Sequence, residues 1–112
     1  MEDCVFCKII KGEIPSKKVY EDDEVLALYD IKPLAKVHVL VIPKVQTQSL
    51  QNLKEDHKEL LFHIFETINK VAEIVGIDKT GFRVTSNVGE DGGQAVKHLH
   101  FHVMGGEKLP TR

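Results

Sequence analysis

The chain has 112 residues, enough for one hydrophobic core but not for two, so residues 1–112 are expected to form a single domain. Hydrophobic residues make up 42% of it and charged residues 29%, an ordinary globular composition. The 15 Lys and Arg residues are outnumbered by 17 Asp and Glu residues, and this balance does not favour a nucleic-acid partner. No apolar run approaches the roughly 20 residues of a membrane span, and no signal-like segment opens the chain, so a cytoplasmic protein without a membrane partner is expected.

The first half of the chain is predicted to form one short helix followed by three strands. Apolar side chains recur at helical spacing over residues 4–11, and Gly12 and Pro15 are expected to end this helix. Strands are predicted at residues 18–20, 25–29 and 37–42. The first two flank an acidic turn and form a hairpin. The third is almost wholly apolar and β-branched, which is typical of a central strand covered on both faces.

The second half is predicted to form one long helix and two more strands. A helical pattern runs over about residues 54–75 and ends at Gly76. Asn52 with Glu55 is a candidate capping box for its start, although a start two residues later also fits. The apolar stripe of this helix consists of Leu60, Leu61, Ile64, Phe65, Ile68, Val71, Ala72 and Val75. Strands are predicted at residues 82–88 and 98–104. The fold class is therefore α+β: a mainly antiparallel five-stranded sheet with one long and one short helix.

Three of the six histidines alternate with apolar residues near the end of the chain. Side chains two residues apart in a strand point to the same side, so His98, His100 and His102 are expected to form one exposed row, with the intervening apolar residues in the core behind them. Imidazoles this close resist being charged together, so some should stay neutral at pH 7 and be able to act as nucleophiles or metal ligands. Taken alone, such a strand also fits solvent-facing histidines or a simple metal site.

A glycine-rich loop at residues 89–94 leads into the histidine segment. Glycines allow backbone N–H groups to approach an anion closely, and such concave backbone can hold phosphate. Alone, this loop indicates no more than a turn, but beside a row of imidazoles it indicates phosphate chemistry. An imidazole nitrogen can attack phosphorus to give a covalent intermediate, and a neighbouring imidazolium can stabilise the charge or protonate the leaving group.

The alternating pattern His-φ-His-φ-His-φ-φ, where φ is apolar, resembles the signature of the histidine triad (HIT) superfamily. Further blocks that match the family's order lie at residues 4–10, 13–15, 20–22, 30–33, 38, 40–44, 87, 92–94 and 105–106. The chain looks like the histidine-triad nucleotide-binding (Hint) branch rather than the Fhit or galactose-1-phosphate uridylyltransferase branches. The resemblance implies a homodimer in which the sheets of two protomers join, with the long helices and central strands at the contact.

The resemblance also implies an activity: a hydrolase or transferase that cleaves purine nucleoside phosphoramidates or related nucleotidyl conjugates at the α-phosphorus. His100 would attack phosphorus to form a nucleotidyl-histidine, and His102 would contact phosphate oxygens and the leaving group. His98 and His38 would orient and polarise the row, and no cofactor would be required for catalysis. A dinucleoside polyphosphate hydrolase, and a nucleotide- or metal-binding regulatory protein with little catalysis, are the alternatives.

A purine mononucleotide site is implied by the same resemblance. Asp30 would bind the ribose, since a carboxylate can accept two hydrogen bonds from a vicinal diol. The apolar walls for the base would come from Ile31, Val5, Phe6, Ile9 and Leu28. The phosphate side would be held by Asn87, Gly93, Gln94 and the backbone around Ala95. Ala95 stands where many Hint-branch members carry a serine, and losing one neutral donor costs on the order of 1 kcal/mol, so turnover on phosphoramidates is expected to be lower.

Cys4 and Cys7 form a CxxC pair, which in a reducing compartment is more often a metal half-site or a redox pair than a structural disulfide. For bacterial-type relatives, the resemblance implies zinc bound by both cysteines, by a histidine after the Ile-Pro-Lys block and by the first triad histidine. Gln46 stands at that histidine position here, and Gln is a poor zinc ligand. Cys4, Cys7 and His98 are therefore a candidate zinc site with an undefined fourth ligand, and two unligated thiols are the alternative.

Overall fold

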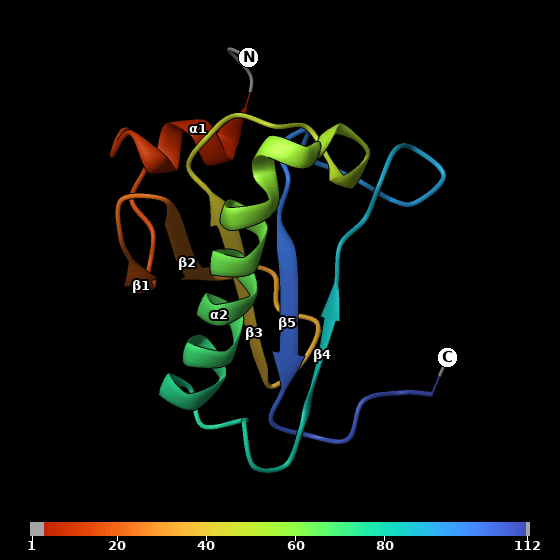
Figure 1. The fold of residues 1–112 in the computed structure, drawn as a ribbon. Coiled ribbons are helices and arrows are strands. Elements are labelled where there is room, and N and C mark those ends of the chain that lie inside the picture. The colour runs from red at the N-terminus through yellow and green to blue at the C-terminus, as the bar shows by residue number, and fades with distance from the viewer. Residues whose placement is uncertain (1–3, 112) are drawn as a thin grey trace.

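Five antiparallel strands form one sheet in the computed structural model, which describes residues 4–111 (Figure 1). The strands are β1 (Lys18–Glu21), β2 (Val25–Tyr29), β3 (Val37–Pro43), β4 (Phe82–Thr85) and β5 (Phe101–Gly105), and they lie in the order β1-β2-β3-β5-β4. The helices are α1 (Val5–Ile10) and α2 (Lys58–Ile74), preceded by two 3₁₀ turns, η1 (Leu50–Asn52) and η2 (Glu55–His57). The predicted α+β class is confirmed. Within residues 4–111, no helix combines the length and apolar character needed to cross a membrane.

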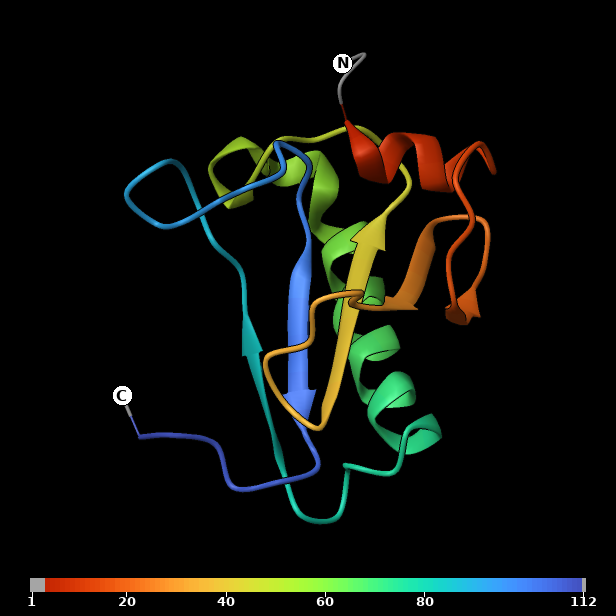
Figure 2. The same ribbon diagram turned by 180° about the vertical axis from the view of Figure 1, so that it is seen from behind.

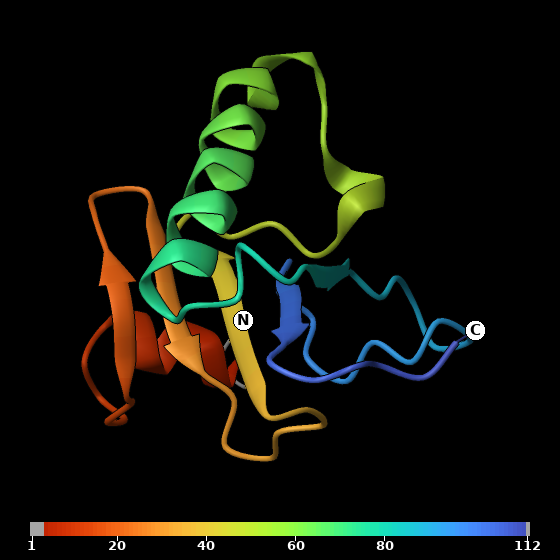
Figure 3. The same ribbon diagram turned by 90° about the horizontal axis from the view of Figure 1, so that it is seen from below.

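The two helices cover opposite faces of the sheet, as the view from below shows (Figure 3). Helix α2 buries Ile64, Ile68 and Val71 against one face, together with alternate residues of β2, β3 and β5. Helix α1 packs Phe6 and Ile9 on the other face, against the remaining alternate residues of β2 and β3. Strand β3 is therefore buried on both sides, as predicted from its apolar sequence.

Strands β3 and β5 lie side by side on the face that the view from behind presents (Figure 2). Their register brings two histidines that are distant in sequence close together. Leu40 lies opposite His102, and His38 lies opposite Met104. His38 and His102 are therefore diagonal neighbours on one face, a distance that aromatic side chains bridge easily. Leu99, between the first two histidines of the row, is buried in the core under α2 as predicted.

The long helix begins later than the sequence pattern suggests. The side chain of Asn52 turns back and its Oδ1 accepts a hydrogen bond from the backbone of Ser49 at 3.1 Å, so the capping box belongs to η1. Asn52 therefore does not cap the long helix, and α2 starts at Lys58. Strand β4 ends at Thr85 instead of residue 88, because the chain then turns away and the hydroxyl of Ser86 donates to the carbonyl of His100 at 2.8 Å.

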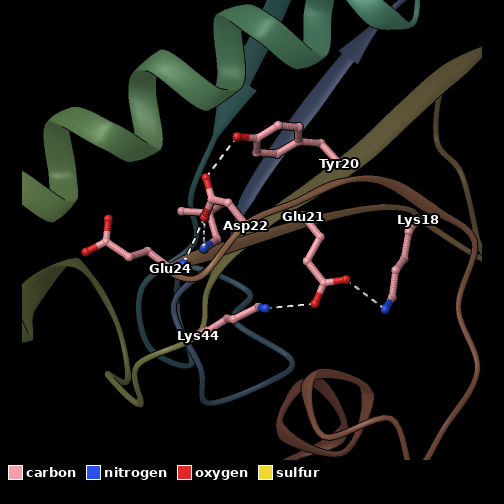
Figure 4. A network of polar contacts seen from close by, with 7 residues as sticks. Lys18, Tyr20, Glu21, Asp22, Glu24 and Lys44 are labelled. Atoms are coloured by element: carbon pink, nitrogen blue, oxygen red, sulfur yellow. Dashed lines mark hydrogen bonds and ion pairs between the residues drawn. The ribbon is translucent and has the colours of Figure 1, made fainter.

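The β1–β2 turn is tied to α2 through one carboxylate. Asp22 Oδ2 lies 2.6 Å from Nε2 of His63 on α2 and accepts a hydrogen bond from the Tyr20 hydroxyl at 2.9 Å. Its Oδ1 accepts from the backbone amides of Glu24 and Val25, both at 2.8 Å (Figure 4). Burial raises the pKa of Asp22, but these hydrogen bonds outweigh it and lower the pKa to about 2.

We expect Asp22→Asn to lower the free energy of unfolding at pH 7 by about 1–2 kcal/mol. The carboxylate stabilises the fold above its unfolded pKa of about 3.9, and this contribution is lost as the pH falls toward about 2. Urea unfolding of both proteins between pH 2 and 7 measures the difference, and Asp23→Asn, at the exposed neighbouring position, is the matched control. A difference that persists unchanged at pH 2 would contradict this assignment.

Candidate active site

Two histidines of the row line an open cavity on the α1 face of the sheet. The cavity has a volume of about 600 Å³, and the rings of His100 and His102 lie 5.1 Å apart, centre to centre, in its wall. The ring of His38 on β3 lies behind them, 5.2 Å from that of His102. Three imidazoles from two adjacent strand segments therefore meet at one side of a space large enough for a small molecule.

A backbone carbonyl determines which ring nitrogen of His100 carries the proton. Its Nδ1 lies 2.7 Å from the carbonyl oxygen of His98, and a carbonyl oxygen can only accept, so Nδ1 carries the proton. In a neutral ring, Nε2 then keeps its lone pair. His100 is only 6% exposed and lines the cavity, so the ring that carries this lone pair is largely desolvated.

A second chain of hydrogen bonds sets the protons of His38 and His102. The amide N–H of Leu34 donates to Nδ1 of His38 at 3.0 Å, so the proton of a neutral His38 is on Nε2. That nitrogen donates to Nδ1 of His102 at 2.9 Å, which leaves the proton of His102 on Nε2. Asp30 Oδ2 lies 3.4 Å from the same His38 nitrogen. The cavity thus has one imidazole ready to donate a lone pair and one ready to donate a proton.

All four imidazoles of this region favour the neutral form. Burial lowers the pKa values of His38, His98 and His100. Burial, and then the proximity of His100 and His38, lowers the pKa of His102 to about 4. The expectation that crowded imidazoles stay neutral at pH 7 therefore agrees with the structure, although desolvation is the larger cause.

The predicted exposed row of three histidines is wrong for its first two members: His98 is fully buried, and His100 is only 6% exposed although it lines the cavity. For His98 the reason is that residues 98–100 precede β5 and the chain bends there instead of continuing the strand. The side chain of His98 points to the interior, where its Nε2 donates to the carbonyl of Pro43 at 2.8 Å. Its own carbonyl is the group that holds His100.

Most of the residues expected at a nucleotide site do surround this cavity. Its lining includes Asp30, Ile31, Val5, Phe6, Ile9, Leu28, Asn87, Gly93 and Ala95. Gln94 does not line it, because its amide group donates to the carbonyls of Gln48 and Val96 and accepts from the amide of Gly89. The side chain of Gln94 therefore shapes the loop from within.

Several cavity residues were not anticipated from the sequence. They are Tyr29, Lys32, Leu34, Leu40, Thr85, Val96 and Met104. For three of them the signal lies in the sheet register. Met104 is two residues beyond His102, and Leu40 and Thr85 lie opposite His102 on the neighbouring strands.

The candidate metal ligands also come together, at the first turn of α1. The Sγ atoms of Cys4 and Cys7 both lie 3.5 Å from Nδ1 of His98, and Gln46 Oε1 is 2.7 Å from the Cys7 sulfur. Burial, followed by contact with Cys4, raises the pKa of the Cys7 thiol. The donor set of two sulfurs and one imidazole nitrogen fits zinc, which prefers these atoms in tetrahedral sites, and zinc there would fix the start of α1.

The fold and the site together define a class of protein: an α+β domain in which neutral imidazoles and a glycine-rich loop lie beside an open cavity. A family model described as HIT domain matches residues 11–109, and the chain belongs to this family. It is similar to a histidine triad protein from Clostridium difficile, with 53% identity, a TM-score of 0.95, and 100% and 97% of the two chains covered. A HIT family hydrolase from Legionella pneumophila is 41% identical, with a TM-score of 0.93 and 96% of each chain covered. A histidine triad nucleotide-binding protein from Candida albicans is 34% identical, with a TM-score of 0.74 and 98% and 85% covered.

We expect His102 to titrate near pH 4 in the folded protein, well below an ordinary histidine at about 6.5. The reason is its burial beside two other imidazoles, which opposes a charge on its ring. NMR of the imidazole C–H resonances between pH 3 and 8 measures this midpoint. A midpoint near 6.5 for His102 would contradict the described environment.

Proposed function

We propose that the protein is a hydrolase or nucleotidyl transferase that cleaves purine nucleoside phosphoramidates or related nucleotidyl conjugates. The proposal rests on His100, which lines the cavity and whose Nδ1 bonds to the His98 carbonyl, so that Nε2 of the neutral ring keeps its lone pair. Membership of the HIT domain family supports the same chemistry. So does the similarity to a Legionella protein described as a hydrolase and to a Candida protein described as nucleotide-binding.

In the proposed reaction, Nε2 of His100 attacks the α-phosphorus, and the bond from phosphorus to the leaving nitrogen breaks. The imidazole ring of the resulting nucleotidyl-histidine is cationic. The carbonyl of His98 stabilises it, because a hydrogen bond from a charged N–H donor is stronger than one from a neutral donor. Nε2–H of His102 donates a hydrogen bond to a phosphate oxygen, and the leaving nitrogen takes up a proton from solvent as the amine departs. Water then attacks phosphorus, breaks the bond to His100, releases a proton to solvent and frees the mononucleotide, which leaves His100 neutral again.

The other residues that line the cavity are suited to bind a nucleoside. Asp30 lies at the cavity with one carboxylate oxygen accepting from the amide of Lys32 at 2.8 Å, which fixes the group while leaving lone pairs for ribose hydroxyls. Ile31 is 90% exposed at the cavity, which apolar side chains of α1 also line. A purine ring between these walls would remove that apolar surface from water, at roughly 25 cal/mol per Å².

We also propose that two copies form a homodimer along β4 and α2. Within residues 4–111, β4 pairs with β5 alone and so offers its outer backbone groups to a further strand, whereas the central strands that the resemblance suggested are paired on both sides. Phe62 and Phe65 on α2 are 67% and 43% exposed, and Phe65 packs edge-on against Phe101 of the adjoining strand. Val84 on β4 is 38% exposed as well. Pairing of two β4 strands would join the sheets and cover these side chains.

Replacement of His100 by alanine should lower turnover of an adenosine phosphoramidate by roughly 10³-fold or more, since no other group supplies the attacking nitrogen. The dissociation constant of AMP should change only a few-fold, because the base and ribose contacts remain. Stopped assays and calorimetry measure the two quantities, and His57→Ala, outside the cavity, is the control. Normal turnover by the His100 variant would refute the proposed chemistry.

The same assays separate the rival functions. Faster cleavage of diadenosine polyphosphates than of adenosine phosphoramidates would favour a dinucleoside polyphosphate hydrolase. Tight AMP binding without a nucleotidyl-histidine burst would favour a regulatory nucleotide-binding protein. The residue that favours this second alternative is Ala95, which lines the cavity and offers no hydroxyl donor to a phosphate oxygen.

Phe62→Glu should shift the protein from dimer to monomer, because a charge would be buried in the proposed contact. Light scattering after size-exclusion chromatography measures the mass, and Glu59→Gln, in the first turn of the same helix, is the control. A wild-type protein that is monomeric at high concentration would remove the basis for the dimer.

A further inference from the structure

The loop between β2 and β3, residues 30–36, forms one side of the cavity but packs little against the rest of the domain. Asp30, Ile31, Lys32 and Leu34 all line the cavity. The two large apolar side chains of the loop are mostly in solvent, since Ile31 is 90% exposed and Leu34 is 79% exposed. Contacts with the hydrophobic core therefore contribute little to holding this loop in place, and hydrogen bonds to its backbone have that role.

Two side chains of the site hold the first part of this loop. The amide of Lys32 donates to Oδ1 of Asp30 at 2.8 Å, and the amide of Leu34 donates to Nδ1 of His38 at 3.0 Å. The second bond fixes the tautomer of His38, whose Nε2 then donates to Nδ1 of His102 at 2.9 Å. Displacement of the Leu34 amide would therefore free the tautomer of His38 and, with it, that of His102.

Glu107 holds the other end of the loop from the segment that follows β5. Its Oε2 accepts a hydrogen bond from the amide of Lys36 at 2.8 Å, and a bond to a carboxylate is stronger than one between neutral groups. The paired ends of β3 and β5 bring the two residues together, because Val37 lies opposite Gly105. Gly106 allows the turn between them: its φ is 82°, and a Cβ atom there would lie 2.9 Å from Cγ2 of Val37.

We propose that Glu107 is a positioning residue for the reaction and acts on His102 through the loop and His38. By holding the amide of Lys36, Glu107 keeps the loop where the Leu34 amide reaches His38. His38 then keeps the proton of His102 on Nε2, from which it is donated to a phosphate oxygen in the proposed reaction. This role rests on the proposed function, because it gives Glu107 a part in that reaction.

Loss of the bond from Lys36 to Glu107 should slow turnover more than it weakens nucleotide binding. The ribose and the base belong at Asp30 and Ile31, near the start of the loop. There the bond of Asp30 to its neighbouring amide does not involve Glu107. A loss of turnover without a matching loss of AMP affinity therefore distinguishes positioning of His102 from a general loosening of the cavity.

The kinetics of adenosine phosphoramidate hydrolysis by Glu107→Ala and Glu107→Gln, with calorimetry of AMP binding, test this role. Glu107→Ala should lower kcat by about three- to tenfold, the effect of one hydrogen bond, while the dissociation constant of AMP changes by less than about twofold. Glu107→Gln should restore most of the turnover, because its amide oxygen can still accept from the Lys36 amide. Glu59→Ala removes an exposed carboxylate in the first turn of α2 and, as the matched control, should leave kcat unchanged.

Long-range ¹H–¹⁵N NMR at pH 7 measures the tautomer of His38 independently of turnover. The wild type and Glu107→Gln should carry the proton on Nε2 of His38, and Glu107→Ala should show a mixture of the two tautomers. Unchanged kcat in Glu107→Ala, or a lower kcat with unchanged His38 resonances, would overturn the positioning role. A wild-type protein without turnover would overturn the proposed function, and the response of His38 to Glu107→Ala would still judge the coupling through the loop by itself.

Discussion

The arrangement at the cavity depends on one hydrogen bond, from Nδ1 of His100 to the carbonyl oxygen of His98, at 2.7 Å. It selects the tautomer that leaves a lone pair on Nε2, and it remains favourable when the ring becomes cationic. The carbonyl is available because residues 98–100 lie before β5 and outside its regular pairing. In a continuous ladder, many strand carbonyls are used by the neighbouring strand. The irregular entry into β5 is therefore the feature that allows a backbone group to orient the side chain.

The two faces of the sheet have different roles: one forms the main apolar core and the other carries the histidines. The α2 face is packed with aliphatic side chains, and it supplies most of the apolar burial that stabilises the domain. The α1 side carries His38, His98, His100 and His102, which are neutral and largely buried. Each bonds at least one ring nitrogen to a backbone group or to another imidazole. Buried polar groups are costly unless they are hydrogen-bonded. These partners make a cluster of imidazoles compatible with a stable fold.

Much of the fold could be predicted from the periodicity of apolar residues in the sequence. Alternation along β3 and near β5 identified the core positions, and the helical stripe identified α2. Matching sequence blocks identified the family, and with it most of the cavity lining. Periodicity could not show where the histidine strand begins, because His98 has the same spacing as its neighbours while the backbone bends there. It also put Phe65 in the apolar stripe of the long helix, but an apolar stripe does not distinguish a core from a surface that another chain covers, and this side chain is 43% exposed.

Side-chain hydrogen bonds account for the other differences. Asn52 and Gln94 were assigned to a helix cap and to the phosphate side of the site, yet both bond to nearby backbone within their own turn or loop. Such local competition depends on the exact turn geometry, which residue type alone does not determine. The position of Gln46 beside Cys7 likewise depends on the path of the connector after β3.

Long-range ¹H–¹⁵N NMR of the imidazole rings at pH 7 shows which nitrogen of His100 carries the proton. We expect the proton on Nδ1, with Nε2 at the chemical shift of an unprotonated ring nitrogen. A protonated Nε2 on a neutral ring, or a doubly protonated His100 at this pH, would leave no lone pair on Nε2 and would contradict the proposed nucleophile.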